Sequence, residues 1–226
     1  MNEELRRSAA HVFVDDVRVP VLAGDDSHHL ARVLRLRDGE TVTVSDGRGS
    51  WRACTWRDGT VQPVGDVHTE PAPSPRLAVA LVPVKGDRTD DAVERLVETG
   101  VDEVIVLGPT DHSVVRRDSG RAAAGVERLA RVARAAAMQS RRVWLADVTG
   151  PVSLADVLAR DGAAIAEPGA DASLDGVTTV VVGPEGGFSQ RETAMARRCV
   201  GLGEGILRAG TAATVVGTLM VAHRRR

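Results

Sequence analysis

TTVVVGPEGGFSQRETAMARRCVGLGEGILRAGTAATVVGTLMVAH, the stretch Thr178–His223, decides the fold. It opens with the β-branched run 178–182, the pattern of a strand buried on both faces of a parallel sheet. The run stops at a glycine-rich bend, Gly183–Gly187. Ser189 and Glu192 follow with the spacing of a capping box, in which the Ser side chain caps a backbone N–H and the Glu reaches back. The spacing therefore predicts that a helix begins here.

The same order of strand, bend and helix then recurs. Gly201 and Gly203 suit the end of the first helix, and Ile206–Arg208 reads as a short buried strand. Ala209–Thr211 leads into a last helix of small and apolar residues. Two bends thus end two strands, which we expect to be neighbours in one sheet. Ligands of open α/β sheets bind beyond the carboxyl ends of the strands, so the two bends are the candidate site.

Each bend alone has a plainer interpretation, a tight turn with glycines at positive φ. Neither bend is a familiar phosphate loop. No G-K-S/T follows them, and G-P-E-G-G-F lacks the G-x-G-x-x-G spacing.

Length and composition favour a soluble chain with one large or two modest domains. The chain has 226 residues, of which 43% are hydrophobic, and no apolar run long enough to span a bilayer. Residues 1–10 are charged and no apolar core follows, so we expect no secretory signal and a cytoplasmic location. Cys54 and Cys199 lack metal-ligand spacing and are expected to be reduced, buried or incidental thiols.

The net charge of −2 gives no global positive field that would indicate nucleic acid. Basic residues are nevertheless clustered, in the stretches 32–37, 116–142 and 224–226. The charge is therefore uneven along the chain, although the preference for Arg over Lys also fits a GC-rich coding sequence.

The amino-terminal region, 11–67, reads as short strands separated by turns, with Asp-Gly pairs at three places. Such spacing predicts a small β-barrel or sandwich. One helix, 26–36, should interrupt it, since Leu30, Val33 and Leu34 have helical spacing.

Two features of this predicted helix could bind ligands. Arg32 and Arg35 would share one face, with Arg37 just beyond, and this stripe is either a solvated surface or a phosphate contact. The neighbouring pair His28–His29 does not predict a metal site, because adjacent side chains diverge and no Cys or carboxylate completes a ligand set.

Residues 68–76 contain three prolines and should form an extended linker. Beyond it, apolar strands alternate with helices, which predicts a mostly parallel sheet covered by helices. The expected strands are 77–84, 102–108, 142–148 and 163–169. The expected helices are 89–99, 122–138 and 154–159.

Several stretches together resemble the SPOUT-class methyltransferases that modify N3 of a uridine in 16S ribosomal RNA. The most specific are G-P-E-G-G-F-S (183–189), L-G-E-G-I-L-R (202–208) and T-A-A (211–213). Others are H-H-L-A-R-V-L-R-L (28–36), K-G-D-R (85–88) with E-R-L-V-E-T-G-V (94–101), A-A-A-M-Q-S-R-R (135–142) and A-E-P-G (166–169). The resemblance covers nearly the whole chain.

The resemblance implies a PUA-like RNA-binding β-barrel at 1–70, a linker at 71–76 and a SPOUT methyltransferase domain at 77–226. It also implies a trefoil knot, in which three loops meet around S-adenosylmethionine, and a homodimer that acts on 16S rRNA within the small ribosomal subunit, without metal or membrane. The cofactor-binding residues that it implies are Ala166, Glu167, Gly183, Gly186, Gly187, Leu202, Gly203, Ile206, Leu207 and Ala209. A Cβ at Gly183, Gly187 or Gly203 would be expected to intrude on the cofactor.

The same resemblance implies roles in catalysis and RNA binding. Arg208 is the first catalytic candidate, as the cation that meets negative charge on the uracil carbonyls; its alternative is a cap on helix carbonyls. Gln139 and Arg142 come second, as a base-edge reader and a phosphate or carbonyl clamp. The expected RNA-binding residues are His29, Arg32, Arg35, Arg37, Lys85 and Arg88. The general base is not identified; Glu185 either fills that role or only shapes its loop.

Two departures from the family pattern leave other functions open. Met138 and Gly210 each stand where the family commonly has Glu. One alternative is therefore a non-catalytic RNA-binding protein with the SPOUT fold, and another is a SPOUT enzyme for another rRNA or tRNA nucleotide or a ribose 2′-OH. The small residues Ala212, Ala213 and Gly217 suit close packing, against either a second subunit or the core of the chain itself.

Overall fold

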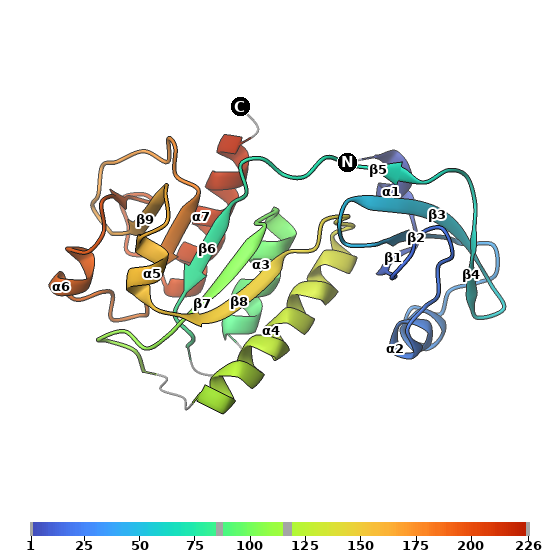
Figure 1. Ribbon diagram of the computed structural model, residues 1–226, viewed down its shortest axis with the longest axis horizontal. Helices are drawn as coiled ribbons and strands as arrows, with labels where there is room; N and C mark the ends of the chain where they lie inside the picture. The colour runs from blue at the N-terminus through green and yellow to red at the C-terminus, as the bar shows by residue number, and fades with distance from the viewer. Residues whose placement is uncertain (1, 85–87, 115–118, 225–226) are drawn as a thin grey trace. The chain divides into compact units, whose positions relative to one another are not determined.

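The structure is a computed structural model that describes residues 2–84, 88–114 and 119–224 (Figure 1). It divides into two compact units. Unit 1 comprises Met1–Ala72 together with Ala137–Leu145, and unit 2 comprises Pro73–Ala136 together with Ala146–Arg226. A short segment from the middle of the chain thus belongs to the amino-terminal unit.

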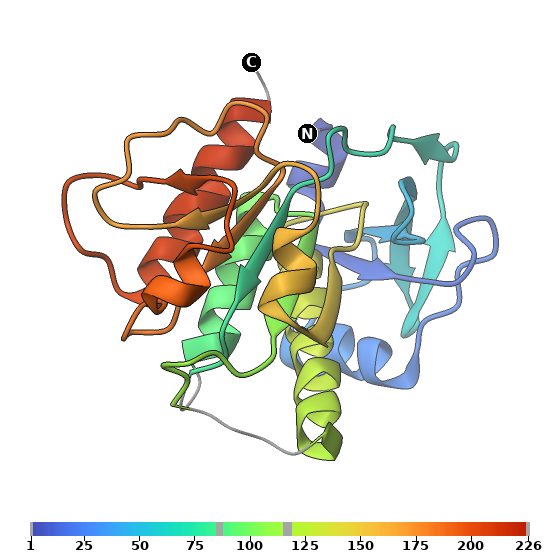
Figure 2. The ribbon, with the colours of Figure 1, turned by 60° about the vertical axis from the view of Figure 1, so that its left-hand side comes forward.

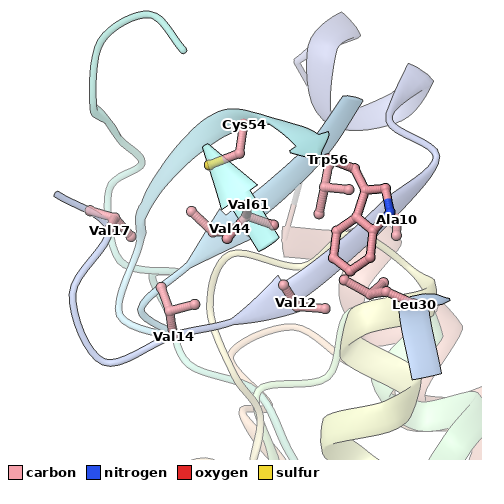
Figure 3. Packing of buried hydrophobic residues seen from close by; sticks show 10 residues of the cluster. Ala10, Val12, Val14, Val17, Leu30, Val44, Cys54, Trp56 and Val61 are labelled. Carbon is pink, nitrogen blue, oxygen red and sulfur yellow. The ribbon is translucent and has the colours of Figure 1, made fainter. Parts of the chain in front are cut away.

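Unit 1 is built on a sheet with the path β1-β2-β3-β4, in which β5 also pairs with β3. Strands β1 and β2 are parallel, and the other pairs are antiparallel. The strands are β1 (Ala10–Phe13), β2 (Thr41–Ser45), β3 (Ser50–Arg57), β4 (Thr60–Pro63) and β5 (His68–Thr69), and a short helix α1 (Glu3–Arg7) precedes them. Figure 3 shows the core of this unit, in which Val12, Val44, Trp56 and Leu30 pack together.

The predicted helix 26–36 is shorter and less regular than its spacing suggested. Helix α2 (Gly24–His28) continues into one π-helical turn, η1 (His29–Val33). Of the three apolar positions, Leu30 is fully buried, but Val33 and Leu34 are 62% and 45% exposed. Arg35 has φ of +53°, outside any helix. The expectation that Arg32 and Arg35 share a helix face is therefore wrong, because the wider π-turn ends the helix before Arg35.

Unit 2 has a six-stranded, all-parallel sheet in the order β11-β9-β10-β6-β7-β8. The strands are β6 (Ala78–Leu81), β7 (Glu103–Leu107), β8 (Asp147–Val152), β9 (Ala163–Ala166), β10 (Thr179–Val182) and β11 (Cys199–Val200). The helices are α3 (Arg88–Thr99), α4 (Ser119–Gln139), α5 (Leu154–Leu158), α6 (Gln190–Thr193) and α7 (Ala209–Arg224). The predicted parallel α/β sheet is confirmed.

Helices cover both faces of this sheet. Helices α3 and α7 contact each other and lie behind the strands in Figure 1, whereas α5 lies in front, against β9 and β10. Figure 2 shows the same layering from the side. The central strands β6 and β10 are buried at every position, as the β-branched run of β10 predicted.

Three expectations about the last elements are wrong. The helix that begins after Ser189 is a single turn and does not reach Gly201. The strand that follows is Cys199–Val200, whereas Ile206–Arg208 forms no strand and Ile206 is 89% exposed. Since Ile206–Arg208 is not a strand, it cannot be the expected neighbour of β10, and β9 separates β10 from the observed strand β11. The order of strands along the sequence does not tell which strands become neighbours in the sheet.

The small residues of α7 pack within the chain. Ala212, Ala213 and Gly217 are buried, and a Cβ built on Gly217 would lie 2.7 Å from Leu96 Cδ2 of α3. The core-facing alternative is therefore the observed one. Strand β8 also begins only at Asp147, since the first residues of the predicted strand 142–148 belong to unit 1.

Candidate functional site

One pocket gathers the loops that follow three adjacent strands of unit 2. Loops after β9, β10 and β11, with the start of α7, enclose about 310 Å³. All ten residues expected to bind the cofactor line it: Ala166, Glu167, Gly183, Gly186, Gly187, Leu202, Gly203, Ile206, Leu207 and Ala209. The pocket is at the carboxyl edge of the parallel sheet, where open α/β folds bind ligands.

Glycines shape this pocket for different reasons. Gly187 has φ of +67° and Gly203 has φ of +133°, and a Cβ on either would meet no protein atom within 4 Å. Their backbone conformation therefore favours glycine, and the space beside them is open to a ligand. A Cβ on Gly183 would instead lie 3.1 Å from the Phe188 ring, so this glycine serves packing within its own loop.

Gly201, assigned by its sequence position to the end of a helix, has another role. A Cβ built on it would lie 2.0 Å from the backbone oxygen of Ala170. Gly201 follows β11 and Ala170 follows β9, so two of the pocket loops approach each other through this glycine. Its φ is not in the left-handed region, so steric contact alone demands glycine.

The predicted capping box at Ser189 and Glu192 is confirmed, and its carboxylate does more than cap. Glu192 is 4% exposed; one of its oxygens accepts the N–H of Ser189 at 2.9 Å and the other accepts the N–H of Asp111 at 2.8 Å. The Asp111 carboxylate in turn accepts from Ser189 Oγ at 2.6 Å and from Arg191 at 2.8 Å. These two donors hold the pKa of Asp111 below its usual value.

His112 extends this network to the glycine bend. Its Nδ1 lies 3.0 Å from the carbonyl oxygen of Gly186 and 3.2 Å from that of Gly187, so a protonated Nδ1 donates to both. The loop after β7 thus holds the loop after β10. Sequence reasoning missed Asp111 and His112; the only available signal was that polar residues follow the predicted strand 102–108.

Arg208 stands between two pocket residues, Leu207 and Ala209, and its side chain is exposed. It immediately precedes α7, and its carbonyl accepts the N–H of Ala212 at 2.8 Å. The groups that need caps at this end are N–H donors, so the alternative role of Arg208 as a cap on helix carbonyls fails. A cation here also opposes the helix dipole and does not stabilise α7. Within the described ranges its side chain has no hydrogen bond or ion pair.

Arg88, expected to bind RNA, pairs with Glu185 of the glycine bend at 3.3 Å. Both side chains remain partly exposed, at 73% and 41%, which limits the strength of the pair. A small cavity of about 20 Å³ lies between Arg88, Gly183 and Gly210, and a Cβ on Gly210 would meet nothing within 4 Å. Lys85 lies outside the described residues.

The remaining expected residues belong to unit 1. Gln139 is the exposed last residue of α4, and Arg142 is half-buried in the segment that follows. His29, Arg32, Arg35 and Arg37 are all exposed. Met138 packs against the core of unit 1, which gives a physical reason for an apolar residue where the family commonly has Glu.

The described ranges contain no group of three His, Cys, Asp or Glu residues that could hold a metal ion. None of their helices combines the length and apolarity needed to cross a bilayer. Burial raises the pKa of the Cys54 thiol to about 11, so it is protonated at neutral pH.

Both parts of the chain match known protein families. Residues 70–221 match the family described as RNA methyltransferase domain. Residues 22–55 match the family described as RNA methyltransferase PUA domain. The first match includes every pocket loop.

Individual relatives agree with these matches. Ribosomal RNA small subunit methyltransferase E of Mycobacterium bovis is 31% identical over 224 residues, covering 89% of this chain and 85% of the relative. The Synechocystis protein of the same name is 30% identical over 217 residues, covering 83% and 68%. A crystal structure of this methyltransferase from Neisseria gonorrhoeae, bound to S-adenosyl methionine, has a TM-score of 0.79 at 23% identity and covers 95% of this chain and 97% of its own. The last similarity is one of fold.

Proposed function

The chain belongs to the RNA methyltransferase family, and from this premise we propose that it transfers a methyl group from S-adenosylmethionine to ribosomal RNA of the small subunit. The pocket at the carboxyl edge of the unit 2 sheet carries the proposal, because every residue that the family resemblance assigns to the cofactor lines it. The protein is expected to act on ribosomal subunits in the cytoplasm.

The pocket suits this cofactor in size and chemistry. Its volume of about 310 Å³ is within the range of small-molecule sites. Gly187 and Gly203 leave backbone groups open to an adenosine, and the carboxylates of Glu167 and Glu185 suit a cation. The N–H groups at the start of α7 suit a carboxylate. When bound, S-adenosylmethionine supplies an electrophilic methyl group on a positively charged sulfur.

The finer proposal is methylation of N3 of a uridine in 16S rRNA. N3 must lose its proton, and the negative charge then spreads onto the O2 and O4 carbonyls of uracil. Arg208, exposed beside the pocket and without a structural partner in the described ranges, supplies the cation that stabilises this charge. Gln139 and Arg142 read and hold the substrate nucleotide.

RNA contacts are proposed for His29, Arg32, Arg35, Arg37, Lys85 and Arg88. The trefoil knot and the homodimer are part of the same proposal. The outward face of α7 offers a surface for a second copy, since Leu219 on this face is 42% exposed. Thr211, Thr218 and Ala222 are exposed on the same helix at compatible spacing.

The test is methylation of small ribosomal subunits by the purified protein, followed by mass mapping of the rRNA. One methyl group on N3 of a single 16S uridine is the expected product. A methyl group on another nucleotide or on a ribose 2′-OH would replace the finer proposal. Binding of RNA without any methyl transfer would identify a non-catalytic RNA-binding protein.

Arg208→Ala tests the mechanism in the same assay. Affinity for S-adenosylmethionine should stay nearly unchanged, while the single-turnover rate falls by about two to three orders of magnitude, as for loss of an oxyanion donor. The deficit should shrink as pH rises, because more uridine then loses its proton unaided. A loss confined to RNA affinity would make Arg208 a binding residue.

A further inference from the structure

The segment that carries Gln139 and Arg142 is anchored to the sheet of unit 1. Ser45 Oγ donates to the carbonyl of Val143 at 3.1 Å, and the N–H of Gly49 donates to the same oxygen at 3.0 Å. The N–H of Leu145 donates to the carbonyl of Gly47 at 2.9 Å. Buried His11 has Nε2 3.0 Å from the carbonyl oxygen of Arg142. The segment thus behaves as an added part of the sheet.

Between these two residues, Arg141 adopts a conformation that glycine normally supplies. Helix α4 ends at Gln139, and Arg141 has φ of +60°. The N–H of Arg142 donates to the carbonyl of Ala137 at 2.9 Å, and the N–H of Arg141 donates to that of Met138 at 3.3 Å. These two bonds make a Schellman motif in which Arg141 occupies the left-handed position that favours glycine. A side chain there costs about 1 kcal/mol or more, and the hydrogen bonds of the Arg141 guanidinium offset this cost.

The Arg141 guanidinium uses all five of its N–H donors inside unit 1. Nη1 donates to the carbonyls of Met138 and Gln139, both at 3.0 Å. Nη2 donates to the carbonyls of Ser8 and Ala9 at 3.1 and 3.3 Å, and Nε donates to Ser8 Oγ at 3.2 Å. An arginine has five donors in a fixed fork, so none is left for a phosphate.

Resting on the proposed function, we propose that Arg141 is a positioning residue for substrate recognition. Its side chain joins the carboxyl-terminal end of α4 to the start of β1, and so fixes Gln139 and Arg142 on the RNA-binding unit. The residues that read the nucleotide therefore form one rigid surface with the barrel. Arg141 acts through Gln139 and Arg142 and does not touch RNA itself.

Arg141→Gly separates this role from backbone effects, because glycine keeps the Schellman motif and removes only the clamp. At saturating small subunits, the single-turnover methylation rate should fall about a hundredfold, as for a misplaced catalytic geometry. Affinity for S-adenosylmethionine, measured by calorimetry, should not change, which also shows that unit 2 is folded. Arg141→Lys should restore little, since an ammonium has three donors and no fork.

The decisive measurement is a double-mutant cycle with Gln139→Ala, whose side chain carries the proposed base contact while its carbonyl stays in place. In the wild-type background Gln139→Ala should lower the rate about tenfold or more. In the Arg141→Gly background the same substitution should lower the rate less than about threefold, because a displaced Gln139 side chain no longer makes the base contact that the substitution removes.

Arg160→Ala provides the matched control. Arg160 also makes a structural fork, with two bonds to Glu103 at 2.8 and 3.2 Å, but it lies in unit 2 outside the pocket. Its effect and that of Gln139→Ala should be additive. If the wild-type protein is active and the effects of Arg141→Gly and Gln139→Ala are additive, the positioning role is overturned. Full activity of Arg141→Lys would overturn it as well. An inactive wild-type protein would overturn the proposed function and this inference with it.

Discussion

Replacing Gly201 by Ala should damage the cofactor pocket through a single methyl group. The added Cβ would lie 2.0 Å from the carbonyl oxygen of Ala170, about 1 Å inside the 3.0 Å limit that real Cβ atoms respect. The clashing atom belongs to the backbone of Ala170, so no side-chain rotation can remove the clash. The loop after β11 must therefore move away from the loop after β9, and both loops line the pocket.

The expected cost follows from overpacking, which typically destabilises by about 1–3 kcal/mol. If this destabilisation affects only the pocket closed around S-adenosylmethionine, the dissociation constant measured by calorimetry should rise about 5- to 150-fold. If the destabilisation affects the folded state of unit 2 as a whole, the thermal unfolding midpoint should fall by roughly 2–12 °C.

Gly210→Ala is the matched control, because a Cβ at this glycine of α7 meets no atom within 4 Å and its φ is ordinary. Its affinity should match the wild type, and its unfolding midpoint should rise slightly, since alanine favours helix. The steric reasoning fails if Gly201→Ala leaves both affinity and midpoint unchanged, or if the two variants behave alike.

Three further perturbations test other parts of the structure. Gly187→Val should abolish cofactor binding and lower the folding stability by about 1–2 kcal/mol, because position 187 has a positive φ. Gly187→Asn should also lose binding but with less destabilisation. Normal cofactor affinity of the Asn variant would show that the bend is only structural. Replacing Arg32, Arg35 and Arg37 with Ala should reduce the slope of log RNA affinity against log salt by roughly one unit per lost phosphate contact, without changing cofactor affinity; an unchanged slope would assign RNA to another surface. Burial tends to raise the pKa of Glu103, but the hydrogen-bonded guanidinium of Arg160 outweighs this effect, so the pKa is lowered in the folded state. The stability that the Glu103–Arg160 pair contributes is therefore present above about pH 4.3, the ordinary pKa of Glu. It is lost as pH falls through the lower folded-state pKa of Glu103. Glu103→Gln should therefore be less stable than wild type in urea at pH 7 and lose less on acidification; an unchanged midpoint at pH 7 would contradict the assignment.

The sequence by itself determined the class of fold, and its resemblance to the SPOUT-class family supplied the residues expected to line the pocket. The β-branched run 178–182 has the period of a buried parallel strand, and the capping box at Ser189 and Glu192 is a local hydrogen-bond pattern that four residues specify. The two glycine-rich bends together predicted a ligand site at the carboxyl edge of the sheet, although each bend alone also fits a tight turn. All of these signals lie within a few residues of one another.

Only the tertiary structure decided which distant residues meet. The order of β10, β9 and β11 depends on crossover connections, and the contact of Gly201 with Ala170 follows from that order. Gly217 packs on α3 because α7 returns to the sheet beside it. Local periodicity also placed Val33 in the core, although the π-turn leaves it exposed.

The same limit applies to the segment 137–145. Its sequence pattern is that of the end of a helix followed by a strand of unit 2, but its hydrogen bonds go to the sheet of unit 1. Arg141 has five acceptors, of which three come from Ser8 and Ala9, more than 130 positions away. No propensity or spacing encodes a pairing at that separation, since the free energy that selects it comes from burial and hydrogen bonding that exist only once the sheet has formed.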